Sequence, residues 1–203
     1  MRLRNLAFGT AAAVAGAALW WRKNPSACPY NQRFWVEAPH PLITRGRLRE
    51  ILEAKPGERV LEVGPGTGYY MLDVAEWVKP DGEVDILDLQ QEMLDHTMRR
   101  AGELGLTNVN PTRSDATSMP YEDATYDGAY LVTVLGEIPD QDAAIRELAR
   151  VLKPGGRLVV GELLGDPHYV RLDPLRLRAS GAGLSYERRV GTPLGYFARF
   201  AKP

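Results

Sequence analysis

A glycine-rich turn at residues 64–68 contains the residue types that most directly indicate ligand chemistry. It follows the apolar run of residues 60–63 and reads Gly-Pro-Gly-Thr-Gly. Glycines at alternate positions remove Cβ atoms where a nucleoside would lie against the main chain, and the N-terminus of a following helix offers unpaired N–H donors. Asp88 ends the next β-rich run, where a carboxylate can accept both hydroxyls of a ribose. The turn and Asp88 together predict a site for an adenosine-type ligand.

The third small position of the turn separates it from a dinucleotide fingerprint. That fingerprint requires Gly-x-Gly-x-x-Gly or Ala, because a small third residue lets the helix pack closely on the strand. Counted from Gly64 the third place is Tyr69, and counted from Gly66 it is Met71, and both are too bulky. No Gly-Lys-Ser/Thr follows, so the turn is not a P-loop. The turn therefore favours an adenosine ligand of another kind.

Short β-rich runs alternate with helical stretches through most of the chain, and these elements must position the turn. Strands are expected at residues 59–63, 83–89, 109–112, 126–134 and 157–163, and helices at residues 43–54, 69–78, 90–104 and 140–152. Such alternation predicts a parallel, doubly wound sheet. The sequence therefore belongs to the α/β class.

The last forty residues change character. After an expected helix at residues 173–181, strands at residues 184–190 and 196–201 are joined by a short Gly/Pro loop, which predicts an antiparallel hairpin. We therefore expect a mainly parallel seven-stranded sheet with a C-terminal antiparallel hairpin. The expected domain covers residues 42–203, behind a linker or lid at residues 24–41 and an apolar helix at residues 1–23.

Five short motifs resemble those of the class I S-adenosylmethionine-dependent methyltransferases, in order and at the usual intervals. They are residues 62–68, 85–94, 114–116, 121–127 and 151–158. The sequence is most similar in type to the small methyltransferase-11 and ubiquinone-biosynthesis members. This resemblance implies a Rossmann-like fold, S-adenosylmethionine as the cofactor and methyl transfer as the activity.

The resemblance also implies which residues hold the methionine and ribose parts of the cofactor. Glu62 would bind the methionine ammonium, and Asp88 would bind the ribose hydroxyls. The glycines Gly64, Gly66 and Gly68 would pass beneath the methionine and ribose. For Glu62 an ordinary exposed strand end is the alternative.

Three further residues are implied to surround the adenine. Leu89 would lie against the ring, and Asp115 would accept from its amine. Ala116 would offer its backbone N–H to a ring nitrogen. A turn cap is the alternative role for Asp115.

Glu137 is the best candidate for a catalytic residue, because in this family the acceptor usually lies beyond the fourth strand of the domain. Its carboxylate would act as a general base or hold a cationic group. The alternative is a helix cap ahead of Asp140. Glu162 and His168 follow the fifth strand, another segment that can border the acceptor pocket, and His40 belongs to the expected lid. Either histidine could serve as a base near neutral pH. Surface or loop roles remain open for both histidines.

An uncharged run of 16 residues, at positions 6–21, lies between basic residues at both ends. As a helix it would span about 24 Å, against a hydrocarbon core of about 30 Å. Leu3 and the paired Trp20 and Trp21 would extend it into the headgroup boundary. We expect a membrane anchor over residues 3–21, with a structural helix and a cleaved signal peptide as alternatives. The domain would then face the cytoplasmic side of a membrane, or the cytoplasm if there is no anchor.

Composition limits the partners. The chain has 25 basic and 26 acidic residues, so no broad basic surface is expected for a phosphate backbone. The Asn/Asp-Pro-Pro-aromatic motif of amino-methylating nucleic-acid enzymes is also missing, and no nucleic-acid partner is expected. A single cysteine, Cys28, and three scattered histidines cannot supply a four-ligand zinc site, so no metal is expected.

The acceptor is expected to be a small molecule, because the domain contains no large insertion. Its pocket would be built from loops and residues 24–41, with Tyr30, Phe34 and Trp35 as a roof. A membrane anchor would supply the pocket from the bilayer, which favours an apolar acceptor such as a lipid or quinone. A soluble small-metabolite methyltransferase and a non-catalytic cofactor-binding protein are the alternatives.

Overall fold

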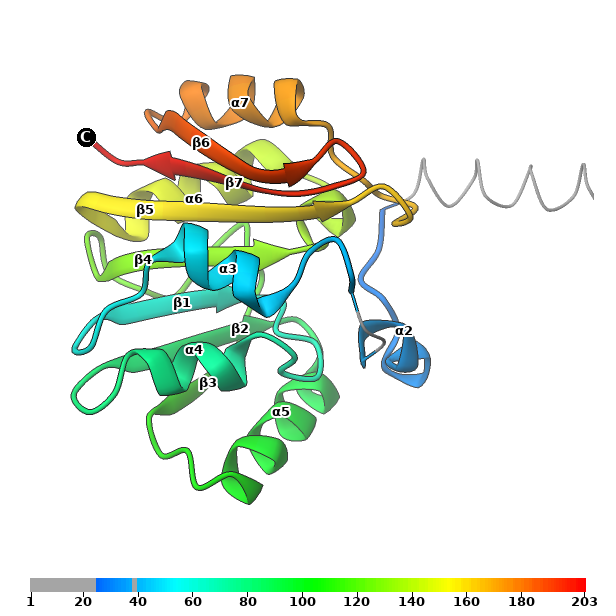
Figure 1. The fold of residues 1–203 in the computed structure, drawn as a ribbon, viewed down its shortest axis with the longest axis vertical. Helices are drawn as coiled ribbons and strands as arrows, with labels where there is room; N and C mark the ends of the chain where they lie inside the picture. The colour runs from blue at the N-terminus through cyan, green and yellow to red at the C-terminus, as the bar shows by residue number, and fades with distance from the viewer. Residues whose placement is uncertain (1–24, 38–39) are drawn as a thin grey trace, which may run out of the picture.

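The computed structural model describes residues 25–37 and 40–203 and contains one seven-stranded sheet in the order β3-β2-β1-β4-β5-β7-β6 (Figure 1). The first five strands pair in parallel, and β7 runs antiparallel to both β5 and β6. The strands are β1 (Arg59–Val63), β2 (Glu83–Asp88), β3 (Val109–Arg113), β4 (Tyr126–Val132), β5 (Leu152–Leu163), β6 (Ser185–Thr192) and β7 (Gly195–Ala201). The predicted doubly wound sheet with its terminal hairpin is confirmed.

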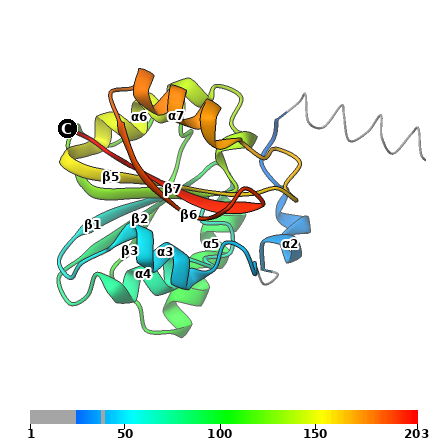
Figure 2. The same cartoon turned by 45° about the horizontal axis from the view of Figure 1, so that its top comes forward.

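Helices cover both faces of the sheet (Figure 2). One face packs against α3 (Arg45–Leu52), α4 (Met71–Trp77) and α5 (Gln91–Glu103), and the other against α6 (Gln141–Val151) and α7 (Leu172–Gly181). Alternating side chains of one strand enter the two layers: Val159 belongs to the first, while Leu158 and Val160 belong to the second. Because both faces of such a strand are buried, its sequence is a continuous apolar run, without the alternation of apolar and polar residues seen in half-exposed strands.

The start of β5 differs from the expected boundary. Leu152 already pairs with Tyr126, whereas the sequence predicted a strand beginning at Arg157. A register shift between the Tyr126–Leu152 pair and the Gly128–Arg157 pair accommodates the intervening Pro-Gly-Gly residues. The Pro-Gly-Gly residues are therefore absorbed as a bulge within the strand.

Arg157 joins the loops at the amino ends of the strands. Its side chain is only 7% exposed and forms an ion pair with Glu58. The guanidinium also donates to the backbone carbonyls of Leu52, at the end of α3, and Asp127, at the start of β4. One buried cation therefore fixes α3 against the sheet at the end opposite the glycine-rich turn.

The residues before the domain are described only in part. Residues 25–37, expected as an irregular linker or lid, contain the 3-10 turn η1 (Tyr30–Gln32) and the short helix α2 (Phe34–Glu37). The predicted membrane anchor over residues 3–21 lies outside the described part of the chain. Across residues 25–37 and 40–203, no helix has the length and apolarity to cross a bilayer.

Candidate active site

Two adjoining cavities lie at the carboxyl ends of β1, β2 and β4, where an open α/β sheet binds its ligands. They have empty volumes of about 810 and 1570 Å³, and we call them the first and second cavities. The wall between them is formed by residues that line both, namely Cys28, Gly64, Val132, Thr133 and Glu137. The first cavity is also lined by the predicted cofactor residues Gly66, Asp88, Leu89, Asp115 and Ala116, and the second by Glu62. Of the predicted cofactor residues, Gly68 lines neither cavity.

The glycine-rich turn has a backbone that only glycine adopts easily. Gly64, Gly66 and Gly68 have φ values of 68°, 56° and 81°. A Cβ added to Gly64 would lie 2.5 Å from a methyl carbon of Val134, so the main chain at this position must stay bare. The Thr97 hydroxyl of α5 donates to the Gly66 carbonyl at 2.9 Å and holds the turn in place. The turn thus forms a rigid floor that a nucleoside can approach closely.

Glu62 ends β1 next to the turn and is 2% exposed, so it is not an ordinary exposed strand end. Its Oε2 accepts a 2.7 Å hydrogen bond from the Tyr130 hydroxyl. Burial raises the pKa of Glu62 to about 8, although the bond from Tyr130 favours the ionised form. A cation that enters the second cavity would remove this cost of ionisation, and the ammonium of an amino acid is such a group.

Asp88 ends β2 and faces the first cavity. Its Oδ1 accepts the backbone N–H of Gln90 at 2.9 Å, which fixes the carboxyl group. Burial raises the pKa of Asp88 to about 6, so the group is mainly ionised at neutral pH. The neighbouring Leu89 is 52% exposed, and a large apolar side chain left open beside a cavity suits the flat face of a base.

Asp115 caps a turn, as one of its two predicted roles requires, and it also lies at the wall of the first cavity. Its Oδ1 accepts the backbone N–H and the hydroxyl of Thr117, each at 2.8 Å, which caps a turn after β3. The same residue also lines the first cavity beside the buried Ala116. The turn cap therefore orients the carboxylate at the cavity wall.

Glu137 lies in the 3-10 turn η2 (Leu135–Glu137), directly after β4. The turn packs so closely on the next loop that a Cβ on Gly136 would lie 1.7 Å from the His168 carbonyl oxygen. Glu137 does not cap the following helix, because Asp140 does so through a 2.9 Å bond from the Ala143 N–H. Its side chain is thus left for the cavities.

The environment of the Glu137 carboxyl favours its protonated form. Burial and the nearby carboxyl of Asp166 raise its pKa to about 8. The backbone N–H of Cys28 donates to Oε2 at 3.3 Å and opposes that shift. Glu137 is therefore a carboxyl group that can gain or lose a proton near neutral pH, at the boundary of the two cavities.

The second cavity combines aromatic and acidic groups. Tyr69 and Tyr70 contribute to its lining, and the Tyr70 hydroxyl donates to the Ile43 carbonyl at 2.5 Å. Burial lowers the pKa of His40, which keeps its ring neutral at pH 7. Lys and Arg do not occur among the described residues that line this cavity. It therefore suits an uncharged or cationic molecule better than an anion.

Several residues at the site carry no sequence signal of their role. Thr133 has φ of 56°, and a β-branched residue in this region indicates strain held by its surroundings. Asp166 and Gln90 also line the cavities. Glu162 was predicted to follow the fifth strand, but it lies within β5 and lines neither cavity. It is 1% exposed, its Oε2 accepts from the Val170 N–H, and burial raises its pKa far above the usual range.

The expected aromatic roof differs from the structure. Among the described residues that line the cavities, those from residues 25–37 are Ala27, Cys28 and Gln32. Tyr30 instead packs against His96 of α5, and Phe34 is 56% exposed. The side chain of Trp35, the third predicted aromatic, lies outside the described part of the structure. Among the described residues, Ala27, Cys28 and Gln32 border the cavities in place of Tyr30 and Phe34.

Comparison with known proteins shows a methyltransferase domain. A sequence profile described as a methyltransferase domain matches residues 60–156. The demethylmenaquinone methyltransferase of Bacillus cytotoxicus is 34% identical over 115 residues, which cover 57% of this chain and 48% of that protein. The ubiquinone/menaquinone biosynthesis C-methyltransferase of Pasteurella multocida is 37% identical over 109 residues, which cover 53% and 41%. The match spans only 33% to 49% of the length of such curated relatives.

Solved structures show the same fold. A SAM-dependent methyltransferase from Aquifex aeolicus superposes with a TM-score of 0.78 at 23% identity, over 86% of this chain and 98% of that one. The profile, the relatives and the fold agree with the cavity geometry. The chain therefore contains a methyltransferase domain, with the fold of the class I S-adenosylmethionine-dependent enzymes, and S-adenosylmethionine is its cofactor.

Proposed function

We propose that the protein transfers a methyl group from S-adenosylmethionine to a small, uncharged, apolar acceptor of the quinol or phenol type. The observation that carries this proposal is the place of Glu137, which lines both cavities. A group at this boundary can reach an acceptor in the second cavity while the cofactor occupies the first. The proposal joins the predicted cofactor residues and the predicted catalytic residue in one site.

The residues assigned to the cofactor have separate tasks. S-adenosylmethionine, when bound, supplies a methyl group on a positively charged sulfur. Glu62 would hold the ammonium of its methionine part, and Asp88 the ribose hydroxyls. Gly64 would let the main chain approach, while Leu89 and Asp115 would border the adenine. Each of these residues lines a cavity, which supports the assignment.

Glu137 would accept a proton from the acceptor. An acidic hydroxyl must lose its proton to become a strong nucleophile, and a base whose pKa is near the operating pH is best suited to take it. Burial raises the pKa of Glu137 to about 8, which brings it closer to that of a phenol than an ordinary carboxylate. In the free protein at pH 7 the group is mostly protonated, so its base form increases as the pH rises through 8.

The nature of the second cavity and the relatives support the acceptor class. Its described lining residues include Tyr69, Tyr70 and Leu163 but no Lys or Arg, so a phosphate or carboxylate acceptor would lack a permanently charged partner. Two relatives carry names that refer to menaquinone or ubiquinone biosynthesis. An apolar acceptor would also be delivered from a membrane if residues 3–21 form the expected anchor.

The proposal is tested with the full chain in detergent micelles, S-adenosylmethionine and chemically reduced demethylmenaquinone. Mass spectrometry measures methylated product, and calorimetry measures cofactor binding. We expect product from the native chain, a loss of about 10²-fold or more in turnover for Glu137→Gln, and unchanged cofactor binding in that variant. Glu103→Gln, an exposed change at the far end of α5, is the matched control.

Other outcomes would redirect the assignment. Turnover with water-soluble phenols and none with the quinol would indicate a soluble small-metabolite methyltransferase. Tight cofactor binding with no product across a broad acceptor panel would indicate a protein that binds the cofactor without turnover. Flotation of the full chain with liposomes separately tests the expected membrane association.

A further inference from the structure

Gln90 occupies a position where its side chain would be expected to cap a helix. It is the N-cap residue of α5, yet its side chain makes no cap hydrogen bond. Ser, Thr, Asp and Asn are preferred at N-caps because their short side chains bond the first free N–H groups. The Gln90 amide instead reaches across the cleft to residues 25–37. This use of the side chain needs an explanation other than helix capping.

The Gln90 amide makes two bonds to one short stretch of main chain. Its Nε2 donates to the Cys28 carbonyl at 2.9 Å, and its Oε1 accepts from the Tyr30 N–H at 3.2 Å. The intervening Pro29 has φ of −62° and ψ of 141°, which presents the carbonyl before it and the N–H after it to the same side. A single primary amide can therefore bind both groups, as a neighbouring strand would.

Cys28 carries this contact on to Glu137. The Cys28 carbonyl faces Gln90, while the Cys28 N–H donates to Glu137 Oε2 at 3.3 Å. On the other side, the Gln90 backbone N–H donates to Asp88 Oδ1 at 2.9 Å. A continuous series of hydrogen bonds thus links the carboxyl group assigned to the ribose with the carboxyl group assigned to proton transfer.

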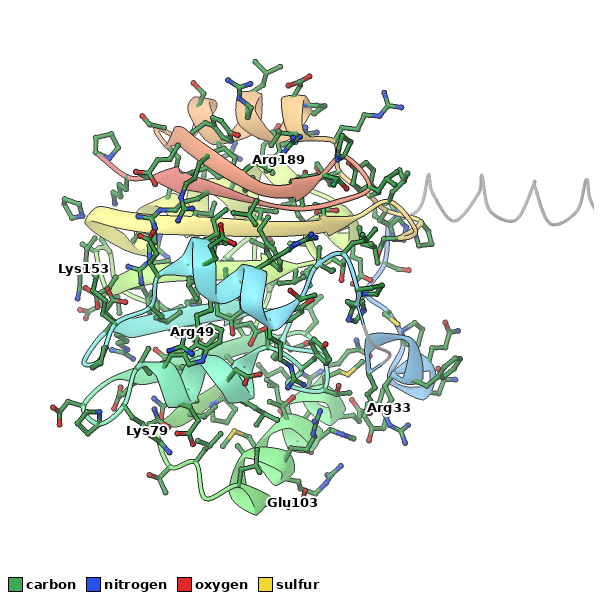
Figure 3. All side chains as sticks on the ribbon, in the orientation of Figure 1. Arg33, Arg49, Lys79, Glu103, Lys153 and Arg189 are labelled. Atoms are coloured by element: carbon green, nitrogen blue, oxygen red, sulfur yellow. The ribbon has the colours of Figure 1, made fainter. Side chains whose placement is uncertain are left out.

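The same segment has a second contact with α5. The Tyr30 hydroxyl lies 3.1 Å from His96 Nδ1, and the Arg33 guanidinium stacks 4.7 Å from the centre of the Tyr30 ring. Figures 1 and 3 show α2 and the labelled Arg33 beyond the carboxyl ends of the strands, beside the start of α5. The contacts with His96 and Arg33 hold the side chain of Tyr30 away from the cavities. At the cavity wall, the Gln90 amide holds the main chain at Cys28.

We infer that Gln90 is a positioning residue: it clamps residues 25–37 over the junction of the two cavities and thereby holds Glu137 through the Cys28 N–H. This inference rests on the proposed function of Glu137. The cofactor and acceptor meet beneath Cys28, so the clamp also excludes water from the reacting groups. Release of the clamp would leave both binding cavities in place but remove one donor from Glu137.

The only cysteine of the chain provides a direct measurement of the clamp. The Cys28 thiol is half-buried, and its burial and the carboxyls of Glu137 and Asp166 raise its pKa. Both effects slow alkylation at neutral pH. Opening of the segment would expose the thiol and move it away from these carboxyls. The alkylation rate of the native chain therefore reports how often residues 25–37 leave the cleft.

The test compares Gln90→Ala with Gln91→Ala in the full chain. Gln91 is the next residue on α5 and bonds Asp95 on the exposed helix surface, so its removal leaves residues 25–37 untouched. We expect iodoacetamide to modify Cys28 about tenfold faster in Gln90→Ala and at the native rate in Gln91→Ala. Gln90→Glu, which keeps an acceptor for Tyr30 but cannot donate to Cys28 when ionised, should resemble Gln90→Ala. Circular dichroism checks that all variants are folded.

A second readout concerns turnover. Gln90→Ala should lower kcat at saturating cofactor, and the rising limb of its pH profile should differ from that of the native chain, because Glu137 loses both the Cys28 N–H and part of its burial. The other groups that act on Glu137, Asp166 after β5 and Asp88 after β2, remain in all variants. Native alkylation rates in Gln90→Ala would overturn the clamp. Because alkylation needs no acceptor, a failure of the proposed function would instead appear as absent turnover in the native chain.

Discussion

Tyr130 on β4 lies opposite Glu62 on β1 in the register of the sheet, and its hydroxyl donates to the Glu62 carboxyl at 2.7 Å. Both side chains are almost completely buried, with exposed fractions of 0% and 2%. A buried carboxyl with one neutral donor stays protonated unless a cation approaches it. The pair therefore couples the protonation of Glu62 to occupation of the site.

Cofactor binding should release protons. The pKa of Glu62 is raised to about 8, so at pH 7 roughly nine-tenths of the free protein carries the proton. An ammonium group favours the ionised form, and about one proton should leave on binding. Calorimetry at pH 7 in two buffers with different ionisation enthalpies measures this release. Glu62→Gln should release markedly less than the native chain, and equal binding enthalpies in both buffers for the native chain would contradict the coupling.

The removal of the Tyr130 hydroxyl should have a smaller effect of the same kind. Tyr130→Phe deletes the donor that favours ionised Glu62, so the pKa of Glu62 should rise further and cofactor affinity at pH 7 should fall by about tenfold. The affinity should recover as the pH increases. Tyr121→Phe, a change at another ring near β4, serves as the control because it lies outside both cavities.

Glu137→Gln should stabilise the protein at high pH while it lowers turnover. The folded-state pKa of about 8 lies above the unfolded value of about 4.3, so the folded state binds the proton more tightly. The stability contributed by the protonated group is present below pH 4, declines as the pH rises and is lost through pH 8. Glutamine keeps the neutral form at every pH. Denaturant unfolding should therefore show a gain on the order of 2 to 4 kcal/mol at pH 8.5 and almost none at pH 4.5.

Arg157→Met should destabilise the domain without a direct effect on the site. The substitution leaves Glu58 near the buried end of the sheet without its cation and removes donors from the Leu52 and Asp127 carbonyls. Loss of one partner of a buried pair costs about 3 to 5 kcal/mol. Chemical denaturation measures this loss. Adding Glu58→Gln should recover part of it, and a double variant as unstable as the single one would show that the charge is not the cause.

The sequence predicted the strands well because strands depend on local patterns, and the residues that it proposed for the cofactor, Gly68 excepted, line the two cavities. The predicted bounds of β1 are the observed ones. Asp88 ends β2 and Gly64 follows β1, as predicted, and both line the first cavity. Such residues act through their own backbone conformation or through the end of their own strand. Neighbouring residues in the sequence therefore contain most of the information.

The acceptor side depends on contacts between distant segments, which a single sequence does not reveal. The bonds from Gln90 to Cys28 and Tyr30 connect residues about sixty positions apart. The positive φ of Thr133 is imposed by the packing of β4 and β5 and has no counterpart in local propensity. Glu162 could not be separated from a cavity residue by sequence, whereas the structure buries it within β5, where it accepts from the Val170 N–H and lines neither cavity.

Gly64→Ala should show that the bare main chain of the turn is required by both conformation and space. At φ of 68° an alanine adds about 1 to 2 kcal/mol of strain, and its Cβ would lie 2.5 Å from a Val134 methyl carbon. Gly57→Ala is the matched control, because φ there is 85° but no atom lies within 4 Å of the added Cβ. We expect Gly57→Ala to lose about 1 kcal/mol of stability and no cofactor affinity.

By contrast, Gly64→Ala should lose about 2 to 4 kcal/mol of stability and at least tenfold in cofactor affinity, since Val134 must move from the wall of the first cavity. The double variant Gly64→Ala/Val134→Ala removes the close contact but keeps the backbone strain. It should recover part of the stability that Gly64→Ala loses, so that its remaining loss relative to the native chain is close to that of Gly57→Ala. Thermal unfolding and cofactor titration measure both quantities. If Gly64→Ala and Gly57→Ala lost equal stability and bound the cofactor equally well, close approach to Val134 would not be what excludes a side chain at Gly64.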